Sequence, residues 1–529
     1  MNKIKSIFNF LKTLNGLSLI AILIVAAFYR LYKIADYMTF LGDEGRDVLK
    51  VYEILHGKLT LLGPTSSVGG FFLGSIYYYF MAPFLLLFNY NPVGPAVMVA
   101  LFGIATVILL YFVVLRFFDK KMAIFASLLY AISPLIVSYS RSSWNPNPFP
   151  FFSLLTLFLI LEALRRNNFK LFLVSGVLLG ISMQLHYLAL FLGVVVFVYV
   201  LFTTLFKSFN RQAFTNLLKR YLTIFLGFLI GWSPFIIFEL RHNFLNFRNI
   251  FEFVLHSGNT GTNEGFFKVI ADVFFRLFGR SVFAFPLPEH LSRFNSLAIN
   301  LWTIFIIVMA VLSITLLVYK FYKSLKEKNI QFYIYSLLIF WFFVSILLFG
   351  FYKKPIYDYY FAFLFPLPFI LVSLLLKFIW ENKKYLKSFS KGFALVIFIV
   401  IFLINLQGIP FRYPPNRQLN QMRSITDFIM TKTNAKPFNF AIITGGNSDH
   451  TYRYFFTIWN HPPTTIEYEG VDPERKSVTD QLFVICESVP CEPIGHSLWE
   501  IAGFGRAEIE NSWDVSVVKV YKLVHYEEK

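Results

Sequence analysis

The chain has 529 residues, of which 57% are hydrophobic, 20% are aromatic and only 15% are charged. Soluble domains average roughly 45–50% apolar residues. With a mean hydropathy of +0.60, this chain has more apolar side chains than the interior of a soluble protein can bury. The formal net charge of +18 comes from short Lys and Arg clusters between hydrophobic runs, a distribution that argues against nucleic-acid binding. We therefore predict an α-helical polytopic membrane protein.

Hydrophobic runs of about 20 residues, the length that crosses a bilayer as a helix, recur along the first 409 residues. About eleven such spans are predicted, near 15–34, 93–115, 122–140, 149–164, 170–186, 188–206, 221–239, 298–319, 331–350, 359–376 and 392–409. Two further apolar stretches, 70–88 and 266–278, either cross the membrane or lie in its interface as interfacial helices. The run 15–34 is expected to be a span rather than a cleaved signal, because no small-residue cleavage site follows it.

Basic clusters orient these spans, because Lys and Arg near span ends stay on the cytoplasmic side. The clusters are Lys3/Lys5/Lys12, Arg116/Lys120/Lys121, Arg165/Arg166/Lys170, Lys207/Arg211/Lys219/Arg220, Lys320/Lys323/Lys326/Lys328 and Lys383/Lys384/Lys387/Lys391. All of them are cytoplasmic only if 70–88 does not cross, so we predict that this stretch lies in the outer interface or re-enters. The protein is expected in the cell membrane (plasma membrane). Its N-terminus is then cytoplasmic and its C-terminus extracytoplasmic.

The predicted outer face carries four loops that are longer and chemically more mixed than the cytoplasmic ones: 35–92, 141–148, 240–297 and 351–358. Residues 1–409 are predicted to form a transmembrane domain with these loops as its functional face. We therefore look for chemistry in the outer loops.

Residues 410–529 change in character and are predicted to form a small extracytoplasmic α/β domain of ordinary domain size. Helical spacing covers Gln418–Thr431, and strands are expected at Phe438–Thr444, Leu482–Cys486 and Asp514–Tyr521. Cys486 and Cys491 either close a small disulfide loop on the oxidising side of the membrane or are two free thiols.

Adjacent carboxylates, Asp43 and Glu44, follow the first span within the segment Gly42 to Asp47. Two carboxylates at a membrane face can supply a general base and a partner for a cation. A solvated acidic turn is the alternative interpretation of the dipeptide taken by itself.

Several motifs follow one another in a fixed order after the first span: Gly42-Asp43-Glu44, an outer amphipathic segment Gly69–Phe88, a span closing on Arg116–Lys120, and a second span ending in Ser133–Leu135 and Tyr139–Arg141. This order resembles the GT-C superfamily of polyprenyl-phosphate-sugar-dependent glycosyltransferases, which includes protein O-mannosyltransferases and the lipid A aminoarabinose transferase. The resemblance covers residues 15–165 and is vaguer to about 409. It implies an enzyme that moves a sugar from a polyprenyl-phosphate donor, which lies among the membrane lipids, to a lipid, glycan or protein acceptor at the outer face. The expected displacement inverts the anomeric centre of the sugar.

The resemblance and the outer position together suggest a role for each polar residue. Asp43 is the expected catalytic base, and Glu44 is expected to orient the acceptor or hold a cation. The donor phosphate is expected to bind outer-face cations, namely Arg141, Arg241, Lys353 and Lys354. The expected acceptor or cleft residues are Arg46, Asn145, Asn147, His186, Glu239, His242 and Tyr359.

Several of these assignments have an alternative. Relatives often carry an acidic residue where this chain has Asn145 and Asn147, which can ligate a cation but bring no charge; no cofactor is certain, and participation of a divalent cation stays open. His186 is either a cleft residue or an interfacial helix cap. Glu239 is either functional or a structural partner of Arg241.

Two other expectations concern the whole chain. The alternative function is a transporter or a flippase for lipid-linked glycans, which should place ionisable residues near the midplane of several spans, whereas the predicted span interiors are nearly free of charge. Because the motifs that resemble the superfamily all precede residue 410, the tail is expected to be dispensable for the chemistry, although not for the choice of acceptor.

Overall fold

The structure is a computed structural model that describes residues 13–66, 70–206, 208–256, 264–327, 330–382, 389–488 and 490–527. Part of the predicted basic clusters lies outside these residues, namely Lys3, Lys5, Lys12, Lys207, Lys328, Lys383, Lys384 and Lys387.

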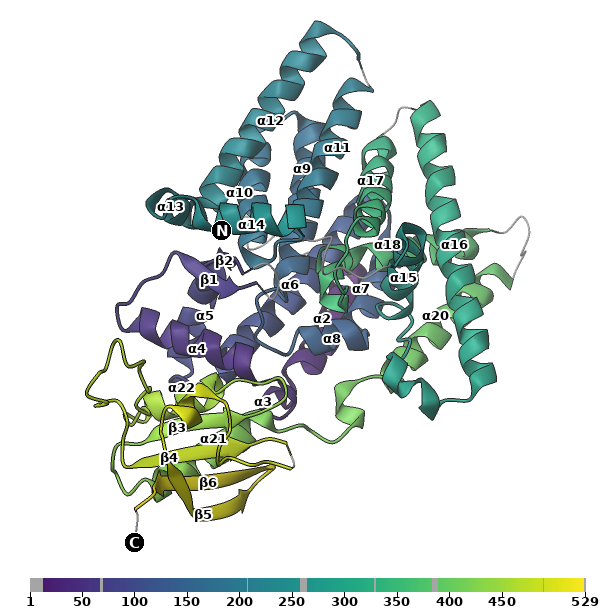
Figure 1. Cartoon of the computed structure of the whole chain (residues 1–529). Helices are drawn as coiled ribbons and strands as arrows, with labels where there is room; N and C mark the ends of the chain where they lie inside the picture. Colours follow the sequence, from purple (N-terminus) through teal and green to yellow (C-terminus); the bar gives the residue numbers. More distant parts are fainter. Residues whose placement is uncertain are drawn as a thin grey trace.

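Each predicted span is occupied by a single helix or by a pair of consecutive helices (Figure 1). The single helices are α2 (Leu14–Leu31), α6 (Val93–Phe117), α9 (Phe149–Arg166), α10 (Phe169–Leu185), α11 (Ala189–Leu205), α16 (Ser296–Glu327), α17 (Gln331–Gly350) and α20 (Ser390–Gln407). The periodic apolar runs thus predicted the position of these helices to within a few residues, except for α16, which runs on to Glu327.

The remaining three spans are broken, and each break lies next to a proline. The pairs are α7 (Lys120–Ile132) with α8 (Pro134–Tyr139), α12 (Arg211–Gly231) with α13 (Ser233–Arg241), and the 3₁₀ helix η3 (Asp358–Leu364) with α18 (Pro366–Glu381). Proline lacks a backbone N–H and disfavours helix in the preceding residue, so it begins a new helix. The predicted span 221–239 corresponds to the second half of α12 together with α13: the first helix begins earlier, at Arg211, and breaks at Trp232, before Pro234.

Length and composition identify the strongest candidates for crossing a membrane. Among the described residues, five helices are long and apolar enough, namely α6, α12, α16, α17 and α20, or six if the pair η3 and α18, bent by 62°, forms one span. Several shorter apolar helices, such as α10 and α11, accompany them. The protein is a helical integral membrane protein, while the predicted number of about eleven crossings stays a prediction.

Short elements fill the predicted outer loops. They are α3 (Ile34–Tyr37), α4 (Gly42–Leu55), β1 (Leu62–Thr65), β2 (Phe72–Gly74), α5 (Ile76–Leu87), α14 (Leu245–His256), α15 (Phe266–Gly279) and the 3₁₀ helix η2 (Pro288–Arg293). The ambiguous stretches 70–88 and 266–278 correspond to α5 and α15, of 12 and 14 residues. At 1.5 Å per residue such helices are roughly 20 Å long, short of the ~30 Å hydrocarbon core.

The tail is a four-stranded sheet with helices packed on it. Its elements are the 3₁₀ helix η5 (Pro410–Arg412), α21 (Gln418–Lys432), β3 (Asn439–Ile443), α22 (His450–Ile458), β4 (Gln481–Cys486), α23 (Trp499–Ala502), β5 (Ala507–Val515) and β6 (Val518–His525). The strand order is β3-β4-β6-β5, with β3 and β4 parallel and the other pairs antiparallel.

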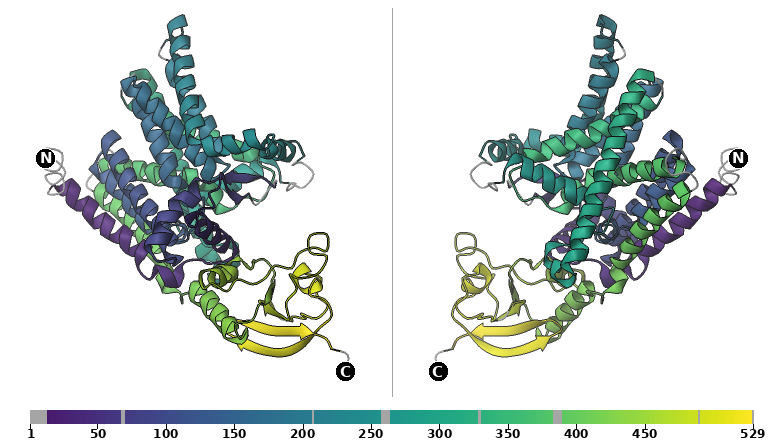
Figure 2. Two further views of the ribbon diagram at one scale, coloured as in Figure 1. Left: turned by 90° about the vertical axis from the view of Figure 1, so that its left-hand side faces the viewer. Right: turned by 90° about the vertical axis from the view of Figure 1, so that its right-hand side faces the viewer.

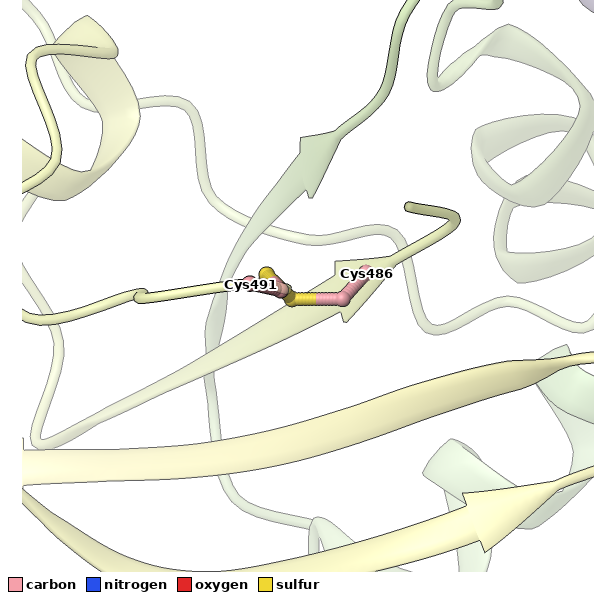
Figure 3. Close-up of a disulfide and its surroundings, with 2 residues drawn as sticks. All are labelled: Cys486 and Cys491. Carbon is pink, nitrogen blue, oxygen red and sulfur yellow. A yellow bond between two sulfur atoms is a disulfide. The ribbon is translucent and has the colours of Figure 1, made fainter. Parts of the chain in front are cut away.

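Two expectations for the tail have different outcomes. The predicted strand Asp514–Tyr521 was wrong, because β5 ends at Val515 and β6 begins at Val518, so the apolar pattern continues through a tight turn in which Ser516 has φ +57°. Cys486, at the end of β4, forms a disulfide with Cys491, with their Cα atoms 6.1 Å apart (Figure 3). The alternative of two free thiols is thereby excluded.

The tail packs on the outer loops of the helical part. One hydrophobic core joins Tyr452 and Phe455 of α22 to Val48 of α4 and Tyr77 of α5. Both views in Figure 2 show the yellow tail at one end of the molecule, and Figure 1 shows α4 between the tail and the helices. The loop 35–92 and the tail therefore lie on the same side of the helical part.

Candidate active site

A cleft of about 440 Å³ opens where three distant segments meet. The first loop contributes Thr39, Leu41, Gly42, Asp43 and Glu44, the second contributes Ser138, Tyr139, Ser142, Trp144 and Asn147, and the tail contributes Gly446, Asn447 and Ser448. Clefts of this size are typical of small-molecule sites. The predicted catalytic pair thus lies in a cavity, together with one of the predicted asparagines.

Asp43 is the accessible carboxylate of the cleft. It lies in the first turn of α4, and its side chain is 55% exposed. The guanidinium of Arg46 donates to Asp43 at 2.9 Å and to the buried Asp47 at 2.8 Å. This ion pair and the positive end of the α4 dipole hold a carboxylate oxygen at the mouth of the cleft.

Glu44 has the opposite environment although it is the next residue. Its side chain turns back, and Oε2 accepts a hydrogen bond from the backbone N–H of Leu41 at 3.1 Å, as in a capping box. Burial, and secondarily the charges of Asp43 and Asp47, raise the pKa of Glu44 to about 7. Burial likewise raises the pKa of Asp47 to about 6. Glu44 therefore shapes the turn that carries Asp43.

Hydrogen bonds tie the second loop to the first. The backbone N–H of Thr39 donates to the hydroxyl of Ser142 at 3.0 Å, and the amide of Asn147 donates to the carbonyl of Ser142 at 2.8 Å. Tyr77 and Ser143 share a hydrogen bond of 2.7 Å between their hydroxyls. These contacts fix the part of the cleft lining that the second loop contributes.

Several predicted site residues bind the ends of helices. Arg141 is 1% exposed, and its two terminal nitrogens each donate at 2.8 Å to carbonyls at the C-terminus of α2, those of Tyr29 and Tyr32. Asn145 donates to the carbonyl of Leu185, the last residue of α10, at 2.7 Å. Both side chains thus satisfy backbone groups that helix ends leave without partners.

The same holds for the predicted residues of α13. The Glu239 carboxylate is fully buried and accepts hydrogen bonds from Asn246 and from the backbone N–H of Phe247, in the first turn of α14. These hydrogen bonds join α13 to the start of α14, and a functional role for Glu239 stays a prediction. Arg241 and His242 are exposed at the end of α13, and the His242 ring stacks on Phe238.

His186 lies in a buried aromatic cluster behind the cleft. Its ring stacks on Tyr187 with centroids 4.6 Å apart and contacts Tyr359, while its Nδ1 accepts from the backbone N–H of Leu188 at 3.2 Å. Tyr359 in turn packs against Trp144, a cleft residue, at 4.4 Å. His186 is therefore connected to the cleft through Tyr359 and Trp144.

Two arginines at the C-terminal end of α15, Arg276 in its last turn and Arg280 just after it, were missed from the sequence. Arg276 donates through Nε to Asp358 at 3.0 Å and through Nη2 to the carbonyl of Ile356 at 2.9 Å, and Arg280 also pairs with Asp358. Asp358 precedes Tyr359, which contacts Trp144, and the two predicted lysines, Lys353 and Lys354, lie in the same loop. The spacing of four residues between Arg276 and Arg280, at the end of an amphipathic helix, was the sequence pattern that could have indicated these two arginines.

The residues of the cleft do not form a cluster of metal ligands. In the described parts of the chain, no group of three or more His, Cys, Asp or Glu lies close enough together to hold a metal ion. Glu44 points away from Asp43 toward Leu41, and the Oδ1 of Asn447 accepts from the backbone N–H of Gly42 at 2.8 Å. The donor set in this cleft therefore does not fit a cation held by several carboxylates.

Comparison with known proteins shows what this chain is similar to. Residues 75–238 match the family model described as dolichyl-phosphate-mannose-protein mannosyltransferase. The structure is similar to that of ArnT from Cupriavidus metallidurans in the apo state, with a TM-score of 0.57, 12% identity and coverage of 95% of this chain and 97% of that chain. The chain has the GT-C fold. No curated protein sequence matches it.

Further structures of this fold give the same result. ArnT from Cupriavidus metallidurans bound to undecaprenyl phosphate has a TM-score of 0.56, 12% identity and coverage of 95% of this chain and 97% of that chain. The apo oligosaccharyltransferase of Archaeoglobus fulgidus has a TM-score of 0.50, 14% identity and coverage of 94% and 72%. The resemblance to GT-C enzymes that the motifs indicated is confirmed.

Proposed function

We propose that this protein is a membrane glycosyltransferase that moves a sugar from a polyprenyl-phosphate donor to an acceptor hydroxyl at the outer face. The observation that carries the proposal is the position of Asp43, an accessible carboxylate at the mouth of a cleft in a GT-C fold. The ArnT structure that contains undecaprenyl phosphate supports this class of donor.

The reaction is a single displacement at the anomeric carbon. Asp43 takes the proton of the acceptor hydroxyl while the oxygen of that hydroxyl forms a bond to the anomeric carbon. At the same time the bond from the anomeric carbon to the phosphate oxygen breaks, and the electrons of that bond leave with the polyprenyl phosphate. Attack from the face opposite the leaving group inverts the anomeric centre. Arg46 orients Asp43, and Glu44 holds the turn of α4 through Leu41.

The leaving phosphate needs positive charge near the membrane surface. We assign this role to the loop that carries Lys353 and Lys354, together with Arg276 and Arg280, which surround Asp358 in the same region. Arg141 shapes the site through the carbonyls of α2. Arg241 lies exposed at the end of α13 and is the weakest of the predicted phosphate ligands. No step of the proposed reaction is routed through a metal ion.

The test uses the purified full-length protein in membrane discs with a panel of radiolabelled undecaprenyl-phosphate hexoses and pentoses. We expect release of undecaprenyl phosphate from at least one donor, and loss of that release in Asp43→Asn. A protein that moves the intact lipid-linked sugar across the bilayer without cleaving it would instead be a flippase, and the proposal would then be wrong.

A further inference from the structure

The tail contributes three residues to the cleft, and a chain of hydrogen bonds fixes their position. Asn447 accepts from the backbone N–H of Gly42 at 2.8 Å and donates to Glu487 at 2.8 Å. The Glu487 carboxylate also accepts from the hydroxyls of Thr444 at 2.7 Å and Tyr452 at 3.1 Å. Through Asn447, the half-buried Glu487 carboxylate thus connects the sheet of the tail to the residue that precedes Asp43.

The fit between the tail and α4 requires glycine. A Cβ atom on Gly42 would lie 2.3 Å from the Ser448 hydroxyl, and one on Gly45 would lie 2.4 Å from the backbone nitrogen of Thr451. Contacts this short do not occur between real side chains, so the segment Gly42–Gly45 is adapted to the tail. The loop Gly446–Ser448 is therefore closely packed against α4 and forms a fixed part of the cleft lining.

The chemistry of the lining indicates what the cleft can bind. Its side chains are mainly hydroxyls and amides, from Ser142, Asn147 and Ser448, and two aromatic residues, Tyr139 and Trp144. None of the described residues that line it is Lys or Arg. Hydroxyl and amide side chains exchange hydrogen bonds with sugar hydroxyls, and an aromatic ring offers an apolar face for the ring of a sugar.

The charged residues in and near the cleft further restrict the class of ligand that it can bind. Asp43 is the exposed acid of the lining, and its ion-pair partner Arg46 is not one of the lining residues. An anionic acceptor would therefore meet a carboxylate in the cleft and no lining cation that could bind its own charge. The cationic residues Arg276 and Arg280 pair with Asp358, the neighbour of Tyr359, and do not line the cleft. The two regions thus differ in chemistry, one suited to a phosphate and the other to an uncharged, hydroxyl-rich molecule.

We propose that the cleft binds a neutral glycan as the acceptor and that Ser448, on the tail loop that Asn447 fixes against Gly42, determines the choice of acceptor. This proposal rests on the proposed glycosyltransferase function and names its acceptor class. The acceptor hydroxyl would be held between the Gly446–Ser448 loop and Trp144, within reach of Asp43. A peptide or an anionic lipid headgroup is the competing occupant.

The first arm of the test measures binding without turnover. The full-length protein in membrane discs is titrated with maltose and lactose, with an anionic disaccharide, and with a Ser/Thr peptide, while tryptophan emission is recorded. We expect the neutral disaccharides to change the emission saturably and the change to disappear in Trp144→Phe. Ser448→Ala should weaken that binding by about 2–10-fold, the effect of one lost hydrogen bond.

The controls separate binding from folding. Ser512→Ala, on the exposed face of β5 in the same domain, should leave binding unchanged. Ser448→Cys keeps the size of the side chain and replaces Ser448→Ala if the latter lowers the melting temperature. A response to the peptide or the anionic disaccharide but not to the neutral ones would overturn the proposal.

The second arm measures transfer from the labelled donor. Methyl glycosides should accept the sugar, and Ser448→Ala should raise their KM while leaving the KM of the donor unchanged. Donor turnover with the peptide as the sole acceptor would overturn the glycan assignment while the glycosyltransferase function stands. Saturable disaccharide binding with no donor cleaved under any condition would overturn the glycosyltransferase function and leave a saccharide-binding cleft.

Discussion

Asp43 and Glu44 are adjacent in the sequence, but their carboxylates have different environments and different roles. Asp43 faces the cleft and pairs with Arg46, whereas Glu44 is 7% exposed and bonds to the backbone of Leu41. Within the first turn of a helix, successive side chains point about 100° apart, so the two carboxylates project in different directions although both residues line the cleft. The dipeptide therefore supplies one base and one structural carboxyl group.

The first prediction concerns the base. Asp43→Asn keeps the size of the side chain but removes the group that accepts a proton, so sugar transfer should fall by about 10²–10⁴-fold. Binding of undecaprenyl phosphate, measured by thermal stabilisation, should persist. Asp514→Asn makes the same chemical change on the exposed face of β5 and should be silent. A fully active Asp43→Asn protein would remove Asp43 from the mechanism.

The second prediction concerns the dependence of stability on pH. Burial raises the pKa of Glu44 from its ordinary value of 4.5 to about 7, so between these values the folded protein holds a proton that the unfolded chain has lost. Stability should then fall as pH rises through this window and stay reduced above it. Glu44→Gln cannot titrate, so its melting temperature in detergent should fall less from about pH 5 to about pH 8.

Two details refine this experiment. Asp47, whose pKa burial raises to about 6, contributes in the same direction and remains in the variant, so the slope should shrink rather than vanish. Glu53→Gln on the same helix, where the side chain is 35% exposed and pairs with Lys50, is the control. Equal slopes in the parent and in Glu44→Gln would show that Glu44 is ionised in the folded protein throughout the range.

At the scale of elements, the contact between α4 and α22 depends on the absence of a side chain at Gly45. Alanine is favoured over glycine inside a helix by about 1 kcal/mol, yet a Cβ there would lie 2.4 Å from the Thr451 nitrogen. The third prediction is that Gly45→Ala destabilises the protein by about 1–3 kcal/mol, the usual cost of overpacking. Thermal unfolding in detergent measures it.

Gly392 provides the matched control for this change. It also lies in a helix, α20, but a Cβ atom there would have no atom within 4 Å. Gly392→Ala should therefore be neutral or slightly stabilising. If both alanine variants behaved alike, the packing of the tail on α4 would differ from the one described, and the cleft wall at Ser448 would be in doubt.

The positions of elements were largely predictable, and their ends were less so. Apolar runs of fixed length gave the helices because burial in lipid or in neighbouring helices demands them. The breaks at Ser133 and Trp232 were missed because the apolar pattern continues through a proline. The turn at Ser516 was missed for the same reason, since alternation of apolar residues does not reveal where a strand reverses.

The candidate site could be predicted only in part. Asp43 was recognisable from its place after the first span, but its partners come from far along the chain: the contact of Gly42 with Asn447 joins residues 405 apart, and that of Arg276 with Asp358 joins residues 82 apart. From sequence position, Arg141 was expected to bind the donor phosphate, and Glu239 to be either functional or a structural partner of Arg241; in the structure both side chains hydrogen-bond to backbone groups at helix ends. Polar residues near span ends serve both purposes, and the sequence does not separate them.

At the scale of the whole molecule, the tail constrains the path of the chain through the membrane. Because Asn447 binds Gly42 directly, the tail and the loop 35–92 lie on one side of the membrane, and the chain between them crosses it an even number of times. All predicted spans except the first lie in this interval, and their number is even. Therefore 70–88 and 266–278 either both cross or both stay in the interface.

The length of α5 and α15 decides between these options. Helices of 12 and 14 residues are too short to cross unaided, so both should stay in the interface. The basic clusters then lie opposite the tail, with Ser208 in the loop before α12 on the cytoplasmic side. If both helices crossed, Ser208 would instead lie on the same side as the tail, which makes this residue a reporter of the topology.

The fourth prediction uses an impermeant thiol reagent on intact cells. Ser512→Cys, exposed on β5, should be labelled in intact cells, and Ser208→Cys, also exposed, should be labelled only after permeabilisation. The parent protein should not react, because the disulfide between Cys486 and Cys491 leaves no free thiol in the described residues. Labelling of both variants in intact cells would mean that α5 and α15 cross, and that part of the basic clusters faces outward against the positive-inside rule.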